Sequence, residues 1–181
     1  MLWLFLQRRT DLFDLSPKRM LHVAPEPALA WRFKCVANLD YLSADLDART
    51  AMVKMDICEI HCPDNTFDVI CCSHVLEHVP DDRRAMREFW RVLKSQGWAV
   101  ILVPITAPKT FEDTSVTGPR ERERLFGQYD HVRRYGPDFE ERLEAAGFKV
   151  TRTMTEDLVT DPDEAHYLGV SANETIFLCE K

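Results

Sequence analysis

Short apolar segments alternate with segments of helical character over the first 103 residues, and this alternation constrains the fold more than any other feature of the chain. Five of the apolar segments have the length of a strand: 20–23, 39–44, 51–55, 67–72 and 98–103. Continuous apolar runs are typical of strands that are covered on both faces. Strands that alternate with helices form a parallel sheet with helices on both sides. The sequence therefore predicts the α/β class, with a doubly wound, mostly parallel sheet.

The helices that connect these strands have recognisable ends. Residues 28–34 follow a proline-rich turn, and proline is favoured at the start of a helix. Asp81 suits the N-cap of the next helix, and Gly97 suits the position where that helix stops. A further helix is expected to begin at about Asp138, with Gly147 beyond its end.

The remaining segments complete the expected architecture of one domain of 181 residues. Two late strands, over 148–153 and 175–179, bring the expected sheet to seven strands, the last of them antiparallel. Residues 3–14 have the apolar spacing of an amphipathic helix within an N-terminal segment, 1–17. Residues 106–128 are polar and lack a clean period, and a connection of that length is typical of a lid or a binding loop.

Composition narrows the class of partner. The net charge is −7 and the pI about 5.4, which disfavours a broad nucleic-acid surface. No apolar run is long enough to span a bilayer, and the apolar start has neither the leading charges nor the cleavage site of a signal peptide. We therefore expect a cytoplasmic protein that acts on a small molecule without a membrane partner. Its abrupt start also suggests truncation at the N-terminus.

Acidic and polar residues follow four of the expected strands. In an open parallel sheet, ligands bind beyond the carboxyl ends of the strands, near the point where the strand order reverses. An acid after the second strand is placed to accept hydrogen bonds from two ribose hydroxyls. Asp45 has that position, and Asp56 could accept from an adenine amino group while the backbone of Ile57 reads the ring edge. The residues expected to line one crevice are Ala24, Pro25, Glu26, Asp45, Leu46, Asp56, Ile57, Ser73 and His74.

Residues 20–104 resemble the class I methyltransferases that depend on S-adenosylmethionine (SAM), in particular the methyltransferase type 11 group. The resemblance is carried by Phe67-Asp68 at the start of a strand, by Leu76-Glu77-His78 in the loop that follows, and by Arg91-Val92-Leu93-Lys94 at a helix end. It implies a Rossmann-like fold, SAM as the cofactor, S-adenosylhomocysteine as the product, and methyl transfer to a small molecule.

The chain departs from this family at the first turn. The family has a glycine-rich turn after its first strand, whereas here that turn reads Ala24-Pro25-Glu26 and the first glycine of the chain is Gly97. A subset of the family has a similar Ala-Pro-Glu turn, and some of its members carry a cysteine-rich, zinc-binding segment upstream. Two roles stay open for Glu26: its carboxylate could approach the sulfonium or amino group of the cofactor, or it could compensate a helix dipole.

The acceptor site is expected beyond the fourth strand and the lid. His131, Arg134 and Tyr135 form a mixed basic and aromatic group that could recognise a carboxylate or phosphate, with His131 as a general base. His78 could also act as a base or could hold the next helix, and His74 could line the pocket. A solvated loop that pairs with nearby acids is the alternative for the basic group.

Three alternatives compete with parts of this interpretation. Cys58, His61 and Cys62 suggest a metal site, but a matching second pair of ligands is lacking and the chain's six cysteines are expected to be reduced, so we expect no metal. An NAD-dependent oxidoreductase would share the acid after the second strand, but it too would need the glycine turn. A degenerate, non-catalytic binding module of the same fold is favoured by the missing glycines.

Overall fold

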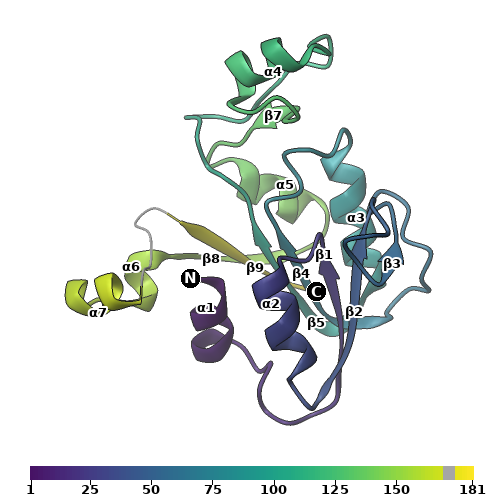
Figure 1. The fold of residues 1–181 in the computed structure, drawn as a ribbon, viewed down its shortest axis with the longest axis vertical. Coiled ribbons are helices and arrows are strands. Elements are labelled where there is room, and N and C mark those ends of the chain that lie inside the picture. Colours follow the sequence, from purple (N-terminus) through teal and green to yellow (C-terminus); the bar gives the residue numbers. More distant parts are fainter. Residues whose placement is uncertain (169–173) are drawn as a thin grey trace.

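A seven-stranded sheet forms the centre of the computed structural model, which describes residues 1–168 and 174–181 (Figure 1). The strand order is β3-β2-β1-β4-β5-β9-β8, and only β9 runs antiparallel to its neighbours. This confirms the predicted doubly wound, mostly parallel α/β sheet. The strands are β1 (Lys18–Val23), β2 (Leu39–Asp45), β3 (Val53–Lys54), β4 (Phe67–Ser73), β5 (Leu93–Leu102), β8 (Lys149–Met154) and β9 (Thr175–Glu180).

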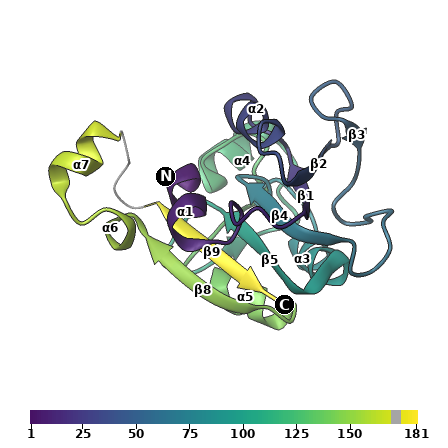
Figure 2. The ribbon, with the colours of Figure 1, turned by 90° about the horizontal axis from the view of Figure 1, so that it is seen from below.

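Helices cover both faces of the sheet, so strand residues are buried on both sides. Figure 2 shows α2 (Pro27–Lys34) on one side and α3 (Asp82–Val92) with α5 (Phe139–Ala145) on the other. Alternate residues of β4 belong to different cores: Val69 packs with α1 (Leu2–Arg9) and α2, whereas Ile70 packs with α3 and α5. The period of two along a strand produces this division.

Three element boundaries differ from the sequence prediction. The N-terminal helix ends at Arg9, where the Thr10 hydroxyl donates to the Leu6 carbonyl oxygen over 2.7 Å. The third strand has only two residues, because it pairs with β2 alone at the edge of the sheet. Gly97 is not a helix stop but lies inside β5, beside a register shift opposite β4. A Cβ atom there would lie 2.8 Å from the carbonyl oxygen of Asp68, so glycine permits the close packing.

The segment predicted as a lid has structure of its own. It contains β6 (Phe111–Glu112) and α4 (Pro119–Phe126), and β6 pairs with β7 (Arg133–Arg134) in a small second sheet. In Figure 1 this unit projects from the top of the molecule. Two short helices, α6 (Thr155–Leu158) and α7 (Pro162–Tyr167), follow β8. Among the described residues, no helix has the length and apolarity needed to cross a membrane.

Candidate active site

A cavity of about 350 Å³ opens at the carboxyl ends of the parallel strands. Strands β1 and β4 are neighbours, but the chain continues from β1 toward one edge of the sheet and from β4 toward the other. The cavity therefore lies at the switch point where this class of sheet binds its ligands. Its walls are Val23, Ala24, Asp45, Leu46, Met55, Asp56, Ile57, Cys58, Val75, His78, Val79, Pro80, Asp81 and Arg84.

The two acids expected to bind a nucleoside both line this cavity. Asp45 ends β2, and its Oδ1 accepts a hydrogen bond from the backbone N–H of Asp47 over 2.9 Å. Asp56 follows β3, and its Oδ1 accepts from the N–H of Cys58 over 2.8 Å. In both residues one carboxylate oxygen fixes a turn, which leaves the other oxygen for a ligand. Leu46 and Ile57 lie beside them in the wall of the cavity.

Ala24 adopts a backbone conformation that glycine usually adopts. Its φ angle is 46°, in the left-handed region, and its N–H donates to the carbonyl oxygen of Ala44 over 2.8 Å. Glycine adopts this region without a steric penalty, and alanine does so at a modest one. The chain thus makes a tight turn from β1 into α2 without a glycine, and the small side chain stays in the wall of the cavity.

Ala24→Val is expected to lower both thermal stability and affinity for S-adenosylhomocysteine, with strain of about 1–3 kcal/mol at this residue. A β-branched side chain fits poorly at a positive φ angle, and its extra methyl groups would enter the cavity. Calorimetric titration and thermal melts of the variant measure the two effects. Ala24→Gly is the matched control and should keep the affinity of the wild type; equal affinity in the valine variant would contradict the placement of this turn.

Pro25 and Glu26 do not line the cavity. Glu26 is the N-cap residue of α2, and its Oε2 lies 3.0 Å from Nε2 of the buried His22. Burial is the largest influence on the pKa of Glu26 and raises it, but hydrogen bonds from His22, from its own backbone and from Ser73 outweigh burial and lower the pKa overall. The Glu26 carboxylate is therefore engaged by β1 rather than directed at the cavity.

Ser73 and His74 mark the end of β4, also outside the cavity walls. Ser73 is buried as the last strand residue, whereas His74 is exposed and has a φ angle of 54°. Nδ1 of His74 lies 3.5 Å from Oε1 of Glu77, and the hydrogen bond with Glu77 raises the pKa of His74.

The structure brings the two candidate catalytic histidines together. His78 lines the cavity, and its ring packs edge to face against that of His131, with ring centroids 4.7 Å apart. Nδ1 of His78 lies 3.3 Å from Oδ2 of Asp130, and Nδ1 of His131 lies 3.3 Å from the carbonyl oxygen of Phe126. His131 is therefore not part of the cavity wall, but it contacts His78, which is.

Tyr135 and Arg134 occupy positions different from those expected of substrate ligands. Tyr135 is fully buried, and its hydroxyl donates to Oδ2 of Asp82 over 2.7 Å. It therefore has no exposed surface for a substrate: it directly follows β7 and packs against Phe139 in the core. Arg134 points the other way and donates to the side-chain and backbone oxygens of Thr106.

Arg133, which directly precedes Arg134 in the chain, anchors the loop that forms one wall of the cavity. Only 3% of its surface is exposed. Its guanidinium donates to the carbonyl oxygens of Leu76, Val79 and Pro80, and to Oε2 of Glu112. The loop from 76 to 80 is thus fixed by an arginine that follows it in sequence by more than fifty residues.

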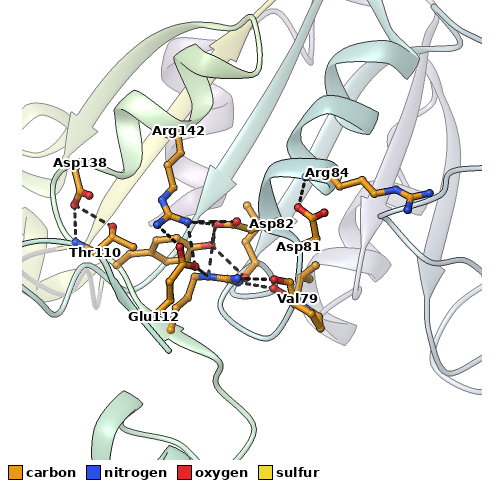
Figure 3. A network of polar contacts seen from close by, with 12 residues as sticks. Val79, Asp81, Asp82, Arg84, Thr110, Glu112, Asp138 and Arg142 are labelled. Carbon is orange, nitrogen blue, oxygen red and sulfur yellow. Dashed lines mark hydrogen bonds and ion pairs between the residues drawn. The ribbon is translucent and has the colours of Figure 1, made fainter. Parts of the chain in front are cut away.

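A buried polar network extends this anchor to α3 and α5 (Figure 3). Asp82 accepts from Tyr135 and from Arg142, and Arg142 also donates to Glu112. The hydrogen bond from Arg142 holds the pKa of Glu112 below its usual value. Figure 3 also shows that Arg84 points away from this network. Arg84 lines the cavity instead.

Sequence reasoning missed several residues of the cavity. Cys58 follows Ile57 in the turn after β3, and Arg84 lies on the first turn of α3. The available signal was the position of Cys58 shortly after β3 and of Arg84 at the start of the helix that follows β4, because ligands bind beyond the carboxyl ends of these strands. The same reasoning applies to the apolar wall formed by Met55, Val75, Val79 and Pro80.

Comparisons with known proteins show similarity to methyltransferases over part of the chain. A family model described as a methyltransferase domain matches residues 20–101. The chain is 36% identical over 67 residues to the ubiquinone/menaquinone biosynthesis C-methyltransferase UbiE of an Enterobacter species, a match that covers 37% of this chain and 22% of that protein. The matched segments span less than a third of the length of the curated relatives.

Solved structures show the same fold over nearly the whole chain. A SAM-dependent methyltransferase from Archaeoglobus fulgidus superimposes with a TM-score of 0.66 at 16% identity, over 97% of this chain and 91% of that one. Phosphoethanolamine N-methyltransferase 2 from Haemonchus contortus, in complex with S-adenosyl-L-methionine, has a TM-score of 0.66 at 14% identity, over 99% and 51% of the two chains. With its seven-stranded sheet and its cavity at the switch point, the chain has the fold of these SAM-dependent methyltransferases, and its residues 20–101 match the methyltransferase domain model.

Proposed function

We propose that this chain transfers the methyl group of SAM to a small-molecule acceptor. The observation that carries the proposal is the position of Asp45, the last residue of β2, and of Asp56, just after the adjacent strand β3, because both line one cavity. Asp45 would accept hydrogen bonds from the ribose hydroxyls. Asp56 would accept from the adenine amino group, with the backbone of Ile57 at the ring edge and Leu46 beside it.

The methionine end of the cofactor would lie toward the first turn and the end of β4. Ala24 supplies the close backbone approach, while Pro25 and Glu26 set the start of α2. Ser73 and His74 stand across the switch point from this turn, since β1 and β4 pair in parallel as far as Val23 and Cys72. Glu26 would act there by positioning β1 and α2, because its carboxylate is engaged by His22.

The acceptor would bind beside His78, under the unit formed by β6, α4 and β7. Methyl transfer is a direct displacement at carbon, so the main task of the protein is to align the acceptor with the sulfonium. His78 and His131 are the candidate bases for an acceptor that must lose a proton. Arg134 remains a candidate for recognising an anionic group of the substrate, and segment 106–128 remains the candidate lid. The cytoplasmic location and the absence of a nucleic-acid partner stay predictions.

Calorimetric titration of the wild-type protein with S-adenosylhomocysteine, and in parallel with NADH, tests the choice of cofactor. We expect saturable heat with the nucleoside product and none with NADH. Saturable heat with NADH alone would favour an oxidoreductase. No heat with either ligand, together with an unchanged melting temperature, would favour a non-catalytic module and contradict the proposal.

A further inference from the structure

Three side chains with metal-binding atoms converge at the mouth of the cavity. Glu77 and His78 come from the loop after β4, and His131 comes from the segment before β7. The potential ligand atoms of the three residues all lie within 4.8 Å of one another. The backbone joins the two segments at the same place, since the N–H of Val132 donates to the carbonyl oxygen of Glu77 over 2.9 Å.

Each of the two imidazoles has its Nδ1 atom beside an oxygen, as metal-binding histidines usually do. Nδ1 of His131 must donate to the carbonyl oxygen of Phe126, because a carbonyl oxygen can only accept. Nδ1 of His78 faces the carboxylate of Asp130. In each ring Nδ1 is thus directed at an oxygen, and the lone pair is left on Nε2. A carboxylate or carbonyl behind each imidazole is the outer arrangement found around metal-ligating histidines.

The carboxylate of Glu77 supplies an independent indication of a missing partner. Glu77 is 2% exposed, and its Oε2 is a buried side-chain oxygen without a hydrogen-bond partner among the described residues. The other oxygen, Oε1, lies 3.5 Å from His74. A buried, unpaired carboxylate oxygen costs free energy unless something compensates it. A cation at the cluster would do so.

We propose that Glu77, His78 and His131 bind one divalent transition-metal ion. Two imidazoles and one carboxylate are a ligand set that suits zinc and also iron or manganese, and three protein ligands leave at least one position open. The expectation of no metal was drawn from the segment that contains Cys58 and Cys62, which plays no part in this cluster. Because His78 also lines the cavity, the ion would lie next to the cofactor.

The chemical role of this ion rests on the proposed function, whereas the site itself does not. With the ion bound, His78 and His131 would be ligands and not bases. An acceptor hydroxyl bound at the open position would lose its proton to water more readily, because the ion stabilises the alkoxide or phenolate. The oxygen would then form a bond to the methyl carbon as the carbon–sulfur bond breaks. The electron pair of that bond would go to sulfur, giving neutral S-adenosylhomocysteine. The inferred substrate class is therefore a small molecule with a hydroxyl acceptor.

Calorimetric titration of the metal-free full chain with Zn²⁺ alone tests the site. We expect one equivalent to bind, and we expect Glu77→Gln to weaken its binding at least about tenfold. The same substitution should leave the melting temperature of the metal-free protein unchanged or raised, because a neutral amide costs less to bury than a carboxylate with an unpaired oxygen. His131→Gln should weaken metal binding without this gain, since His131 is only partly buried.

His61→Gln is the matched control, because it removes an exposed histidine beside the cysteines and outside the cluster. Loss of Zn²⁺ binding in this control, or equal affinity in the wild type and Glu77→Gln, would overturn the proposal. S-adenosylhomocysteine titrated into Glu77→Gln shows whether the variant still forms its cavity. Cofactor binding without metal binding in the wild type would refute this inference alone. Metal binding without cofactor binding would refute the proposed function and leave the site standing.

Discussion

Replacement of Asp45 by alanine is expected to weaken S-adenosylhomocysteine binding by about 10- to 150-fold, measured by calorimetric titration. The reason is the loss of charge-assisted hydrogen bonds to the ribose, worth about 1.5–3 kcal/mol in total. Asp45 lines the cavity at the end of β2, and only its Oδ1 is used by the local turn. Asp45→Asn keeps an oxygen for that turn and removes the charge. It should therefore retain wild-type stability while still losing affinity.

Asp47→Ala is the matched control for this prediction. Asp47 lies in the same loop and pairs with Arg49 over 2.6 Å, but it is not part of the cavity wall. Its substitution keeps the backbone N–H that donates to Asp45 and should leave affinity for S-adenosylhomocysteine unchanged. Equal affinity in the wild type and in both Asp45 variants would contradict the assigned role of Asp45.

The sheet could be predicted because strands that are buried on both faces consist of nearly continuous apolar residues. The run from Phe67 to Ser73 is nearly continuous in apolar residues, and β4 is buried along almost its whole length. The bounds of strand β3 were predicted less well, since only Val53 and Lys54 pair with β2. The helix before β5 was predicted too long because Gly97 was interpreted as a stop signal. Its actual task is to let β5 pass close to the backbone of Asp68.

The site was predictable where topology alone decides position. Asp45 and Asp56 reach the cavity because the carboxyl ends of parallel strands share one edge of the sheet. The positive φ angle of Ala24 could not be predicted, because alanine gives no signal for that conformation. The direction of the side chains around β7 was equally hidden. A two-residue strand has no period from which to tell that Arg133, and Tyr135 after it, point inward and that Arg134 points outward.

Replacement of Arg133 by methionine is expected to destabilise the protein by about 3 kcal/mol or more, because several buried carbonyl oxygens would lose a charged donor. For a domain of this size that corresponds to a fall in melting temperature of about 6–12 °C. The carbonyl oxygens of Leu76, Val79 and Pro80 all accept from this guanidinium. Arg133→Lys should recover little of the loss, since an ammonium group cannot reproduce the planar fork of donors.

Arg134→Met is the matched control, because it removes the adjacent arginine of β7, whose head group lies at the surface on Thr106. Its effect on stability should stay within about 0.5 kcal/mol. Arg133→Met should also weaken S-adenosylhomocysteine binding below its own melting transition, since the loop that it holds carries His78, Val79 and Pro80 of the cavity wall. Equal melting temperatures for the two variants would show that the loop is held by other contacts. A stability loss with unchanged affinity would show that Arg133 supports the fold without shaping the site.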